Sequence, residues 1–352
     1  MNADFRLVRH SELMICSIRT YFMIRREFLA LFSAFAFQST STVSAQSTRK
    51  AARVGVLWHA ANAEEEDVYL SVVHRAFSDL GYAKGKNVHI EHRFPAEDPE
   101  RFRIMARELV ELNPDAIIAV TTLGANELKS ATSKIPIVFV LGQDPVRDKL
   151  VDSLARPGAN ATGLSLMSDD LTAKRLAILK EAIPKLSRIG LLVDPTIRAR
   201  QKAIVTAHEI ASQQLGLSLG PIEEIANAQA AEVALAKMVK DGVTAVSVGP
   251  GSQLFNLRKQ IGSLALAHKL PAIGIVSESV PYGLLFSYGQ DLPDFFRRAV
   301  VLVDRILRGA KPADLPVEQP TRLKLVLNRR TATALGIQLP PTLVAVADEV
   351  ID

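Results

Sequence analysis

Residues 116–141 read AIIAVTTLGANELKSATSKIPIVFVL. Two apolar runs, at residues 116–120 and 135–141, flank an amphipathic stretch at residues 123–131. Strands buried on both faces of a parallel sheet read as continuous apolar runs, whereas half-exposed strands alternate apolar and polar residues. The segment therefore predicts a buried strand, a helix and a second strand parallel to the first.

The same order of elements recurs along the chain and predicts α/β layering around parallel sheets. Strands are expected at residues 53–58, 87–93, 116–120, 135–141, 188–193, 242–248 and 271–276. Helices are expected at residues 66–80, 100–112, 123–131, 169–183, 198–215, 229–240 and 253–268. The order runs once through residues 53–155 and again through 187–280, with the turn-forming segment RPGANATG at 156–163 between them. A helix at 291–308 and a last strand and helix at 323–335 follow.

Composition agrees with two compact lobes. The chain has 352 residues, of which 48% are hydrophobic and 22% charged, and this balance excludes an intrinsically disordered protein. One domain usually spans roughly 100–200 residues, so two lobes and a cleft between them are expected. The net charge of +5 is spread over interleaved acidic and basic residues, and aromatic residues make up 6%, so we expect no nucleic-acid partner.

The N-terminus predicts an export signal at residues 1–45. Arg25 and Arg26 precede about ten mostly apolar residues, and Val43-Ser44-Ala45 fits a cleavage site after Ala45. The pair also fits a twin-arginine signal, with an ordinary secretory signal or a buried helix as alternatives. Met23 is the better start for such a signal. Cleavage would lower the net charge from +5 to +3, remove the single cysteine and leave a periplasmic protein.

Motifs for catalysis and cofactors are absent from the sequence. No HExxH string occurs, and the one GxSxG string, at residues 216–220, follows a predicted helix instead of a strand and so lacks the context of a nucleophile elbow. The loop Gly249-Pro250-Gly251 follows a strand, but Leu254 breaks the GxGxxG phosphate pattern. His89 and His92 are three apart on a strand and face opposite sides, which disfavours a metal pair. We therefore predict no enzyme activity, no cofactor and no metal.

The remaining polar residues gather in loops that follow the predicted strands. These loops lie at residues 58–66, 121–125, 142–146, 194–197, 249–253 and 277–280. Ligands bind such sheets at the carboxyl ends of their strands, and helix N-termini there favour an anionic group. Paired with one or two carboxylates, they suit a zwitterion such as an amino acid. The alternative is that the Thr, Asp and Ser residues only cap helices.

Several strings resemble one family along the whole mature chain. They include ATSKIPIVF at 131–139 followed by DPV at 144–146, LVDSLARPGANATG at 150–163, SYG at 287–289 and RGAKPADLPVEQP at 308–320. These strings are similar to ABC-transporter substrate-binding proteins of the tryptophan/tyrosine-uptake type. One departure is Ala159, where members of the family carry a second glycine.

The resemblance implies a type I periplasmic-binding-protein fold with two flavodoxin-like lobes joined by a three-stranded hinge. Lobe 1 would comprise residues 52–162 plus 289–320, and lobe 2 residues 163–288 plus 321–352. A monomer would capture a small solute, such as an amino acid or related carboxylate, and deliver it to a membrane permease with its ATPase.

The resemblance and the strand-end loops together single out eight ligand-binding candidates. Thr121 and Thr122 would hold a carboxylate, and Asp144 would pair with an ammonium group or cap a helix. Trp58 and Tyr288 would enclose an apolar or aromatic ligand body, although Tyr288 lies near the hinge and could only pack there. The second lobe adds Asp194, Ser252 and Glu278.

Two other classes of function remain open. One is the ligand-sensing module of a signalling system, since such modules share this fold. The other is an exported α/β enzyme. Fold alone does not separate these from a transport protein.

Overall fold

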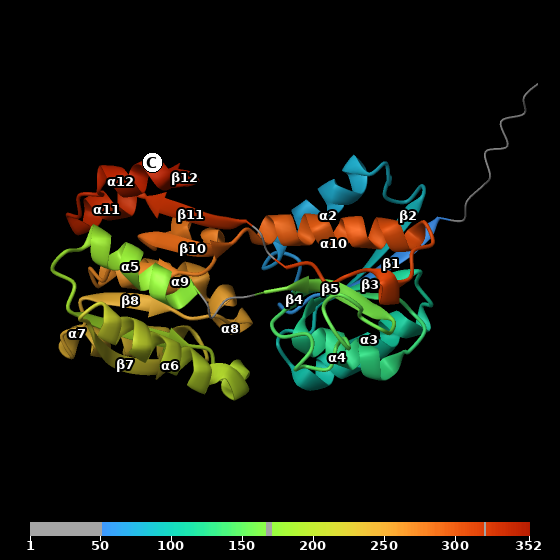
Figure 1. The fold of residues 1–352 in the computed structure, drawn as a ribbon, viewed down its shortest axis with the longest axis horizontal. Coiled ribbons are helices and arrows are strands. Elements are labelled where there is room, and N and C mark those ends of the chain that lie inside the picture. The colour runs from blue at the N-terminus through green and yellow to red at the C-terminus, as the bar shows by residue number, and fades with distance from the viewer. Residues whose placement is uncertain (1–50, 167–170, 320–321) are drawn as a thin grey trace, which may run out of the picture. The chain divides into compact units, whose positions relative to one another are not determined.

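The computed structural model describes residues 51–166, 171–319 and 322–352, and residues 50–352 belong to one compact unit. Two α/β lobes make up this unit, each around its own sheet (Figure 1). The predicted export signal at residues 1–45, including Met23 and the cleavage site at Ala45, lies outside the described residues.

The first lobe contains a five-stranded parallel sheet with the order β2-β1-β3-β4-β5. Its strands are β1 (Ala52–Leu57), β2 (Val88–Arg93), β3 (Ala116–Thr121), β4 (Ile137–Gly142) and β5 (Ala161–Ser165). The two runs that flank residues 123–131 form β3 and β4, which are parallel neighbours near the middle of the sheet. Both strands are buried along most of their length, as continuous apolar runs predict.

The second lobe contains a seven-stranded sheet with the order β12-β11-β10-β9-β8-β6-β7. Every neighbouring pair is parallel except β10 and β11, which are antiparallel. Its strands are β6 (Arg188–Val193), β7 (Ser218–Glu224), β8 (Ala245–Val248), β9 (Ala272–Gly274), β10 (Phe286–Gln290), β11 (Leu323–Asn328) and β12 (Glu349–Ile351).

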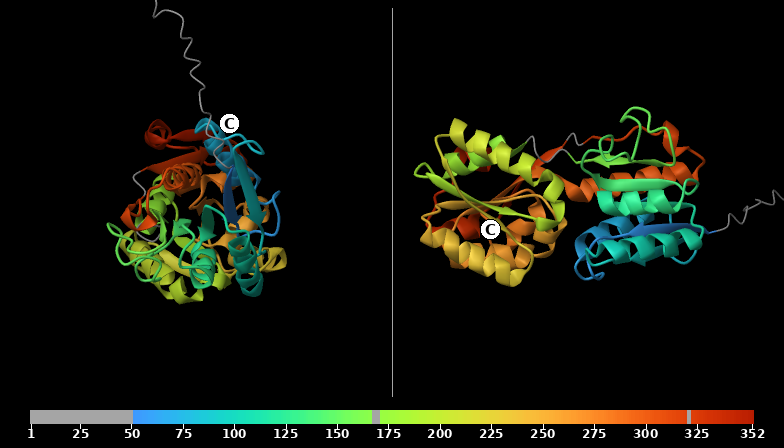
Figure 2. Two further views of the ribbon diagram at one scale, coloured as in Figure 1. Left: turned by 90° about the vertical axis from the view of Figure 1, so that its right-hand side faces the viewer. Right: turned by 90° about the horizontal axis from the view of Figure 1, so that it is seen from below.

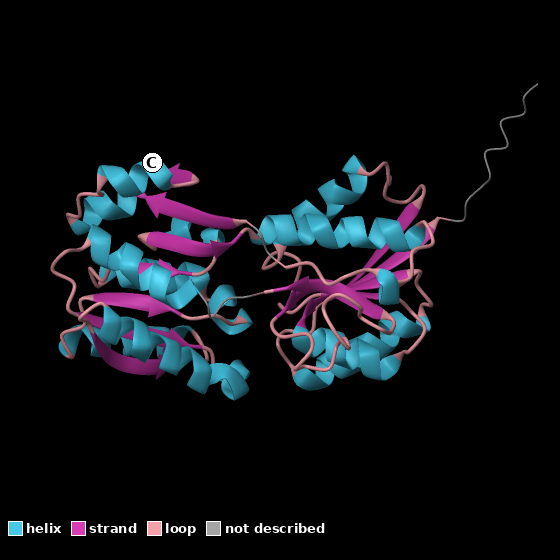
Figure 3. Ribbon diagram, in the orientation of Figure 1, coloured by secondary structure: helices cyan, strands magenta, loops and turns pink. Residues whose placement is uncertain are grey.

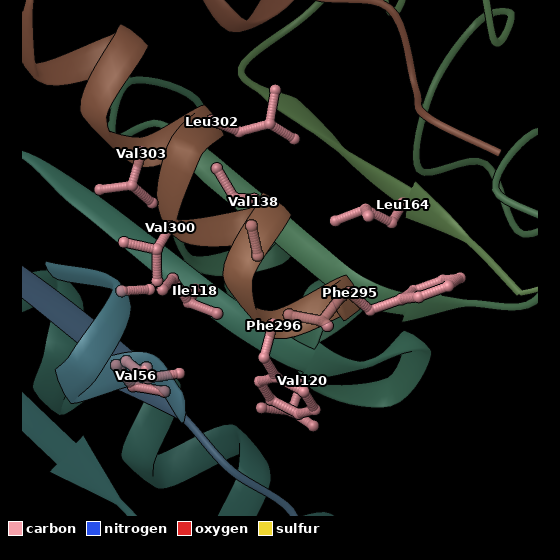
Figure 4. Packing of buried hydrophobic residues seen from close by; sticks show 14 of the residues in the cluster. Val56, Ile118, Val120, Val138, Leu164, Phe295, Phe296, Val300, Leu302 and Val303 are labelled. Carbon is pink, nitrogen blue, oxygen red and sulfur yellow. The ribbon is translucent and has the colours of Figure 1, made fainter. Parts of the chain in front are cut away.

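Helices cover both faces of the first-lobe sheet. One core cluster joins the sheet to α2 (Asp67–Asp79) and α10 (Leu292–Leu307), and another joins it to α3 (Pro99–Glu111) and α4 (Thr122–Ala131). Figure 4 shows Phe295, Phe296 and Val300 of α10 over side chains of the strands. A helix from late in the chain therefore completes the core of the first lobe.

The second-lobe sheet also lies between helices (Figures 2 and 3). One cluster contains residues of α5 (Thr172–Ala182), α6 (Arg198–Gln214), α11 (Arg329–Leu335) and α12 (Pro341–Val346). Another contains residues of α7 (Ala228–Lys240), α8 (Ser252–Asn256) and α9 (Arg258–Ala267). Three short 3-10 helices complete the described elements: η2 (Pro195–Ile197), η3 (Ser277–Tyr282) and η4 (Pro312–Asp314).

The chain passes between the lobes three times: after β5, between β10 and α10, and between η4 and β11. The predicted fold class of two parallel-sheet lobes with three connections is confirmed. By sheet membership, β5 continues the first sheet to Ser165 and β10 continues the second to Gln290. The lobe boundaries at residues 162 and 289 stay predictions.

All seven predicted strands exist, with ends that differ by up to three residues, but the segment at 156–163 needs a correction. Its last three residues begin β5 instead of ending a turn. Thr162 Oγ1 donates to the Leu315 carbonyl at 2.7 Å, and a Cβ at Gly163 would lie 2.0 Å from the Phe139 carbonyl oxygen. A glycine is needed at residue 163 because the backbone of β4 approaches β5 closely at this point.

Several further elements differ from the sequence prediction, which includes no strand at β10 or β12 and no helix at α12. Strand β7 was not predicted because Gly220 and Pro221 disfavour a strand. It lies at the sheet edge, where a proline's missing N–H is tolerated. The single helix expected at 253–268 is two helices, α8 and α9, that meet at Leu257.

Candidate functional site

A cavity of about 700 Å³ is lined by segments of both lobes. The first lobe contributes residues 121–123 after β3 and residues 141 and 143 at the end of β4. The second contributes residues 248–252 after β8 and 274–276 after β9. These are carboxyl ends of parallel strands, as predicted for the ligand site, and the volume is in the range of small-molecule pockets.

Thr121 and Thr122 line the first-lobe wall of the cavity. Thr121 caps α4, and its Oγ1 accepts a hydrogen bond from Gly124 N at 3.2 Å. Thr122 Oγ1 accepts one from Gln143 N at 3.5 Å, which links the ends of β3 and β4. The Gln143 side-chain oxygen also lies at this wall, enclosed and without a hydrogen-bond partner. This wall therefore offers hydroxyl groups and a spare acceptor.

Ser252 lines the opposite wall, at the start of α8. The preceding Gly251 has φ +137°, and a Cβ there would lie 2.1 Å from Asp194 Oδ2. Asp194 is fully buried and accepts hydrogen bonds from Thr196 N, Thr196 Oγ1 and Gln253 N. Burial raises the pKa of Asp194, although these hydrogen bonds act to lower that pKa. Asp194 thus fixes two loops of this wall and does not line the cavity itself.

Asp144 lies beside the cavity, not in its wall. Its carboxylate accepts a hydrogen bond from Arg147 N at 3.1 Å and pairs with the Arg147 side chain at 3.8 Å. These contacts lie within a turn, and no helix begins at Asp144 for it to cap. Its neighbours Gln143, Arg147 and Asp148 do line the cavity.

Trp58 and Tyr288 do not line the cavity. Trp58 is fully buried in the first-lobe core, where it stacks on Phe94 and Phe296, and its Nε1–H donates to His92 Nδ1 at 3.0 Å. Tyr288 is half-buried on β10 opposite Leu325, and its carbonyl accepts a hydrogen bond from Arg175 Nε. The structure gives both aromatic residues packing roles.

The Trp58 contact determines which nitrogen of His92 carries the proton. Because Nδ1 accepts from Trp58, the proton sits on Nε2, which faces His74 Nε2 at 3.3 Å. Burial, followed by the charges of His74 and Lys84, lowers the pKa of His92 to about 4. His92 is therefore neutral near pH 7.

We expect acid to destabilise the protein through His92. Its pKa is depressed on folding, so the unfolded chain binds more protons between pH 6.5 and 4 and stability falls as pH drops through that window. One pKa unit corresponds to about 1.4 kcal/mol, so with partial exposure the loss is about 2 to 3 kcal/mol. Urea unfolding of the wild type and His92→Gln at pH 4.5 and 7 measures it. The variant should lose less than the wild type, and His89→Gln, an exposed control, should behave as the wild type does.

His59, the residue after Trp58, lines the cavity and lies at the centre of a buried ion cluster. Its Nδ1 lies 2.7 Å from Glu97 and its Nε2 lies 3.2 Å from Glu66. Because each ring nitrogen faces a carboxylate, both carry protons. Burial lowers the pKa of His59, but Glu66 and Glu97 outweigh it and the net pKa is raised. The imidazolium thus balances two carboxylates.

Phe255, on α8 of the second lobe, contacts this part of the first lobe. Its ring contacts His59 edge-on at 6.0 Å and stacks on Tyr69 at 5.4 Å between centroids. The Arg258 guanidinium also lies over the Phe255 ring, 4.1 Å from its centroid. Aromatic contacts of this kind help to hold the two lobes together at the cavity.

The last candidate, Glu278, lies on η3 after β9, and its chain neighbours Val276 and Ser279 line the cavity. Of the eight candidates, the structure therefore brings Thr121, Thr122 and Ser252 to the cavity wall and Glu278 next to it. Sequence reasoning missed Tyr69 and Gln143. Tyr69 follows the core-facing pattern of α2, so its sequence position signals packing alone.

The described residues contain neither a membrane-spanning helix nor a cluster of metal ligands. No helix within them is long and apolar enough to cross a membrane. Nor does any group of three or more His, Cys, Asp and Glu side chains in residues 51–166, 171–319 and 322–352 form a metal site.

Two parallel-sheet lobes with a cavity at their strand ends define a two-lobed binding protein with the type I periplasmic-binding-protein fold. Residues 63–351 match the family of ABC transporter substrate binding proteins, and the chain belongs to this family. Substrate-binding proteins of this kind act outside the cytoplasm. The family resemblance predicted from the sequence is confirmed.

Individual proteins similar to this chain agree with the family. A tyrosine-binding protein of Clostridioides difficile is 26% identical over 266 residues, which cover 75% of each chain. The crystal structure of a conserved domain protein from Vibrio cholerae is 26% identical, with a TM-score of 0.76 over 86% of this chain and 100% of that one. An ABC domain from Streptococcus pneumonia in complex with L-Trp is 24% identical, with a TM-score of 0.75 and the same coverage, and shows the fold alone.

Proposed function

We propose that this protein is the solute-binding component of an ABC importer and binds an amino acid in the cavity between its lobes. The cavity of about 700 Å³, lined by strand ends of both lobes, carries the proposal. The similarity to a tyrosine-binding protein supports an amino acid, with aromatic ones foremost. The bound solute would be released unchanged, without catalysis.

The proposed mechanism is a binding equilibrium coupled to closure of the lobes. A solute that contacts residues 121–123 of one lobe and 248–252 of the other bridges them, and so favours the closed state. A membrane permease with its ATPase would then receive the solute from the closed form. The protein would act as a monomer in the periplasm, exported by the predicted leader and cleaved near Ala45.

Addition of the right amino acid is expected to raise the melting temperature of the purified protein. A ligand at 100 times its Kd stabilises the folded state by about 2.7 kcal/mol. Differential scanning fluorimetry against the common amino acids and the aromatic acids measures this effect. Denatured complex should return the solute unmodified. A flat response across both groups of compounds would contradict the amino-acid proposal, and a chemically altered solute would contradict a transport role.

A further inference from the structure

Glu278 places a buried carboxylate beside the cavity without a partner. Both of its oxygens are enclosed, and neither makes a hydrogen bond of normal geometry, although Ser277 and Tyr69 lie close enough to affect its titration. Burial raises the pKa of Glu278. A buried carboxylate without hydrogen bonds costs free energy, so a ligand that donates hydrogen bonds to the Glu278 oxygens would stabilise it.

Tyr69 brings a second unpartnered oxygen from the other lobe. Its ring lies in the first-lobe core, stacked on Phe296 at 4.4 Å and on Phe255 at 5.4 Å. The hydroxyl is enclosed and has no hydrogen-bond partner. Ser279, the chain neighbour of Glu278, lines the same cavity as Tyr69, and burial, followed by the charge of Glu278, raises the pKa of Tyr69. Tyr69 lines the cavity.

Neither cation near this pair, Lys324 or Arg258, makes a hydrogen bond to Glu278 or Tyr69, although the buried Arg258 Nε has no hydrogen-bond partner. From β11, Lys324 lies near Glu278 but forms an ion pair with Glu349 at 2.8 Å. From α9, Arg258 lies over the Phe255 ring and donates from Nη1 to the Phe255 carbonyl at 3.0 Å. Glu66, at the start of α2, adds negative charge near Tyr69. The surroundings therefore favour a further cation that donates hydrogen bonds.

We propose that Glu278 and Tyr69 form a subsite for the protonated amine of the solute, with one oxygen-bearing group from each lobe. This assignment rests on the proposed function, and it places the amine of the solute at the end of the cavity beside Glu278. An ammonium has three N–H donors, and the Glu278 carboxylate and Tyr69 hydroxyl accept them. Since the two groups belong to different lobes, an amine between them links its recognition to lobe closure.

Isothermal titration of the purified protein with L-tyrosine and with 3-(4-hydroxyphenyl)propionate, which lacks the amine, tests the subsite. We expect the wild type to bind L-tyrosine at least 30-fold more tightly than the propionate. In Glu278→Gln the affinity for L-tyrosine should fall at least 30-fold and that for the propionate should not fall. Tyr69→Phe should show a smaller loss. Glu91→Gln, at the outer strand β2, is the control and should bind both compounds as the wild type does.

A second readout separates a binding role from a structural one. Without solute, Glu278→Gln should melt at or above the wild-type temperature, because it removes an unpartnered buried charge. A lower melting temperature would assign Glu278 to the fold and overturn the proposal. Equal affinity of the wild type for both compounds would overturn the subsite alone. Failure of both compounds to bind would overturn the proposed solute class together with the subsite.

Discussion

Replacement of His59 by leucine is expected to lower the free energy of unfolding by about 3 to 5 kcal/mol at pH 7. The His59 ring lies between Glu97 and Glu66, and all three side chains are largely removed from solvent. Leucine fills a similar volume but leaves two carboxylates without their shared cation. Loss of one partner from a buried ion pair is costly because the other charge stays buried. Urea unfolding followed by circular dichroism measures the change.

Two further variants make the His59 result specific. His89→Leu changes an exposed histidine of the same lobe and should alter stability by less than 1 kcal/mol. Adding Glu97→Gln to His59→Leu should recover part of the lost stability, since it removes one of the uncompensated charges. If His59→Leu costs no more than His89→Leu, or if the second replacement lowers stability further, the charge balance described here is wrong.

Replacement of Gly251 by alanine is expected to lower stability by about 2 to 5 kcal/mol and to weaken solute binding at least tenfold. Gly251 has φ +137°, which L side chains rarely adopt, and its Cβ would lie 2.1 Å from Asp194 Oδ2. Asp194 has little room to move because three hydrogen bonds hold its carboxylate. The loop at residues 248–252 must therefore shift, and this loop lines the cavity.

Gly242 offers a matched control for Gly251 in the same lobe. It also has a positive φ, +72°, but nothing lies within 4 Å of its Cβ position. Gly242→Ala should therefore cost only the backbone strain, about 1 to 2 kcal/mol, and leave solute affinity unchanged. Chemical denaturation and calorimetric titration of both variants measure the two effects. Equal losses in the two variants would show that the contact with Asp194 is unimportant.

The sequence predicted most of the fold because burial on both faces leaves a strong pattern. Strands β3 and β4 are apolar along their length, and their neighbours follow from the strand–helix alternation. Strand β5 escaped prediction since a tertiary contact, the approach of Gly163 to Phe139, decides its structure. Strand β7 escaped because an edge strand tolerates Gly220 and Pro221.

The candidate site was predictable where strand ends determine it, as for Thr121, Thr122 and Ser252. Whether an aromatic residue faces a ligand or the core depends on the layers around it. Trp58 is covered by Phe296, which comes from α10, more than 200 residues later in the chain. Local hydrogen bonds decide the roles of both aspartates: Asp144 bonds within a turn, and Asp194 caps η2. Tyr69 reaches the cavity from a core-facing helix position, which sequence periodicity alone assigns to packing.

The late position of α10 in the chain also affects how the protein folds while it is synthesised on the ribosome. The first five strands of the chain are synthesised by Ser165, yet one face of their sheet is covered by α2 alone until residues 292–307 emerge. A chain that ends between β5 and α10 therefore has exposed apolar surface on its first lobe and a tendency to aggregate. The binding cavity comes into existence only when the polypeptide is nearly whole.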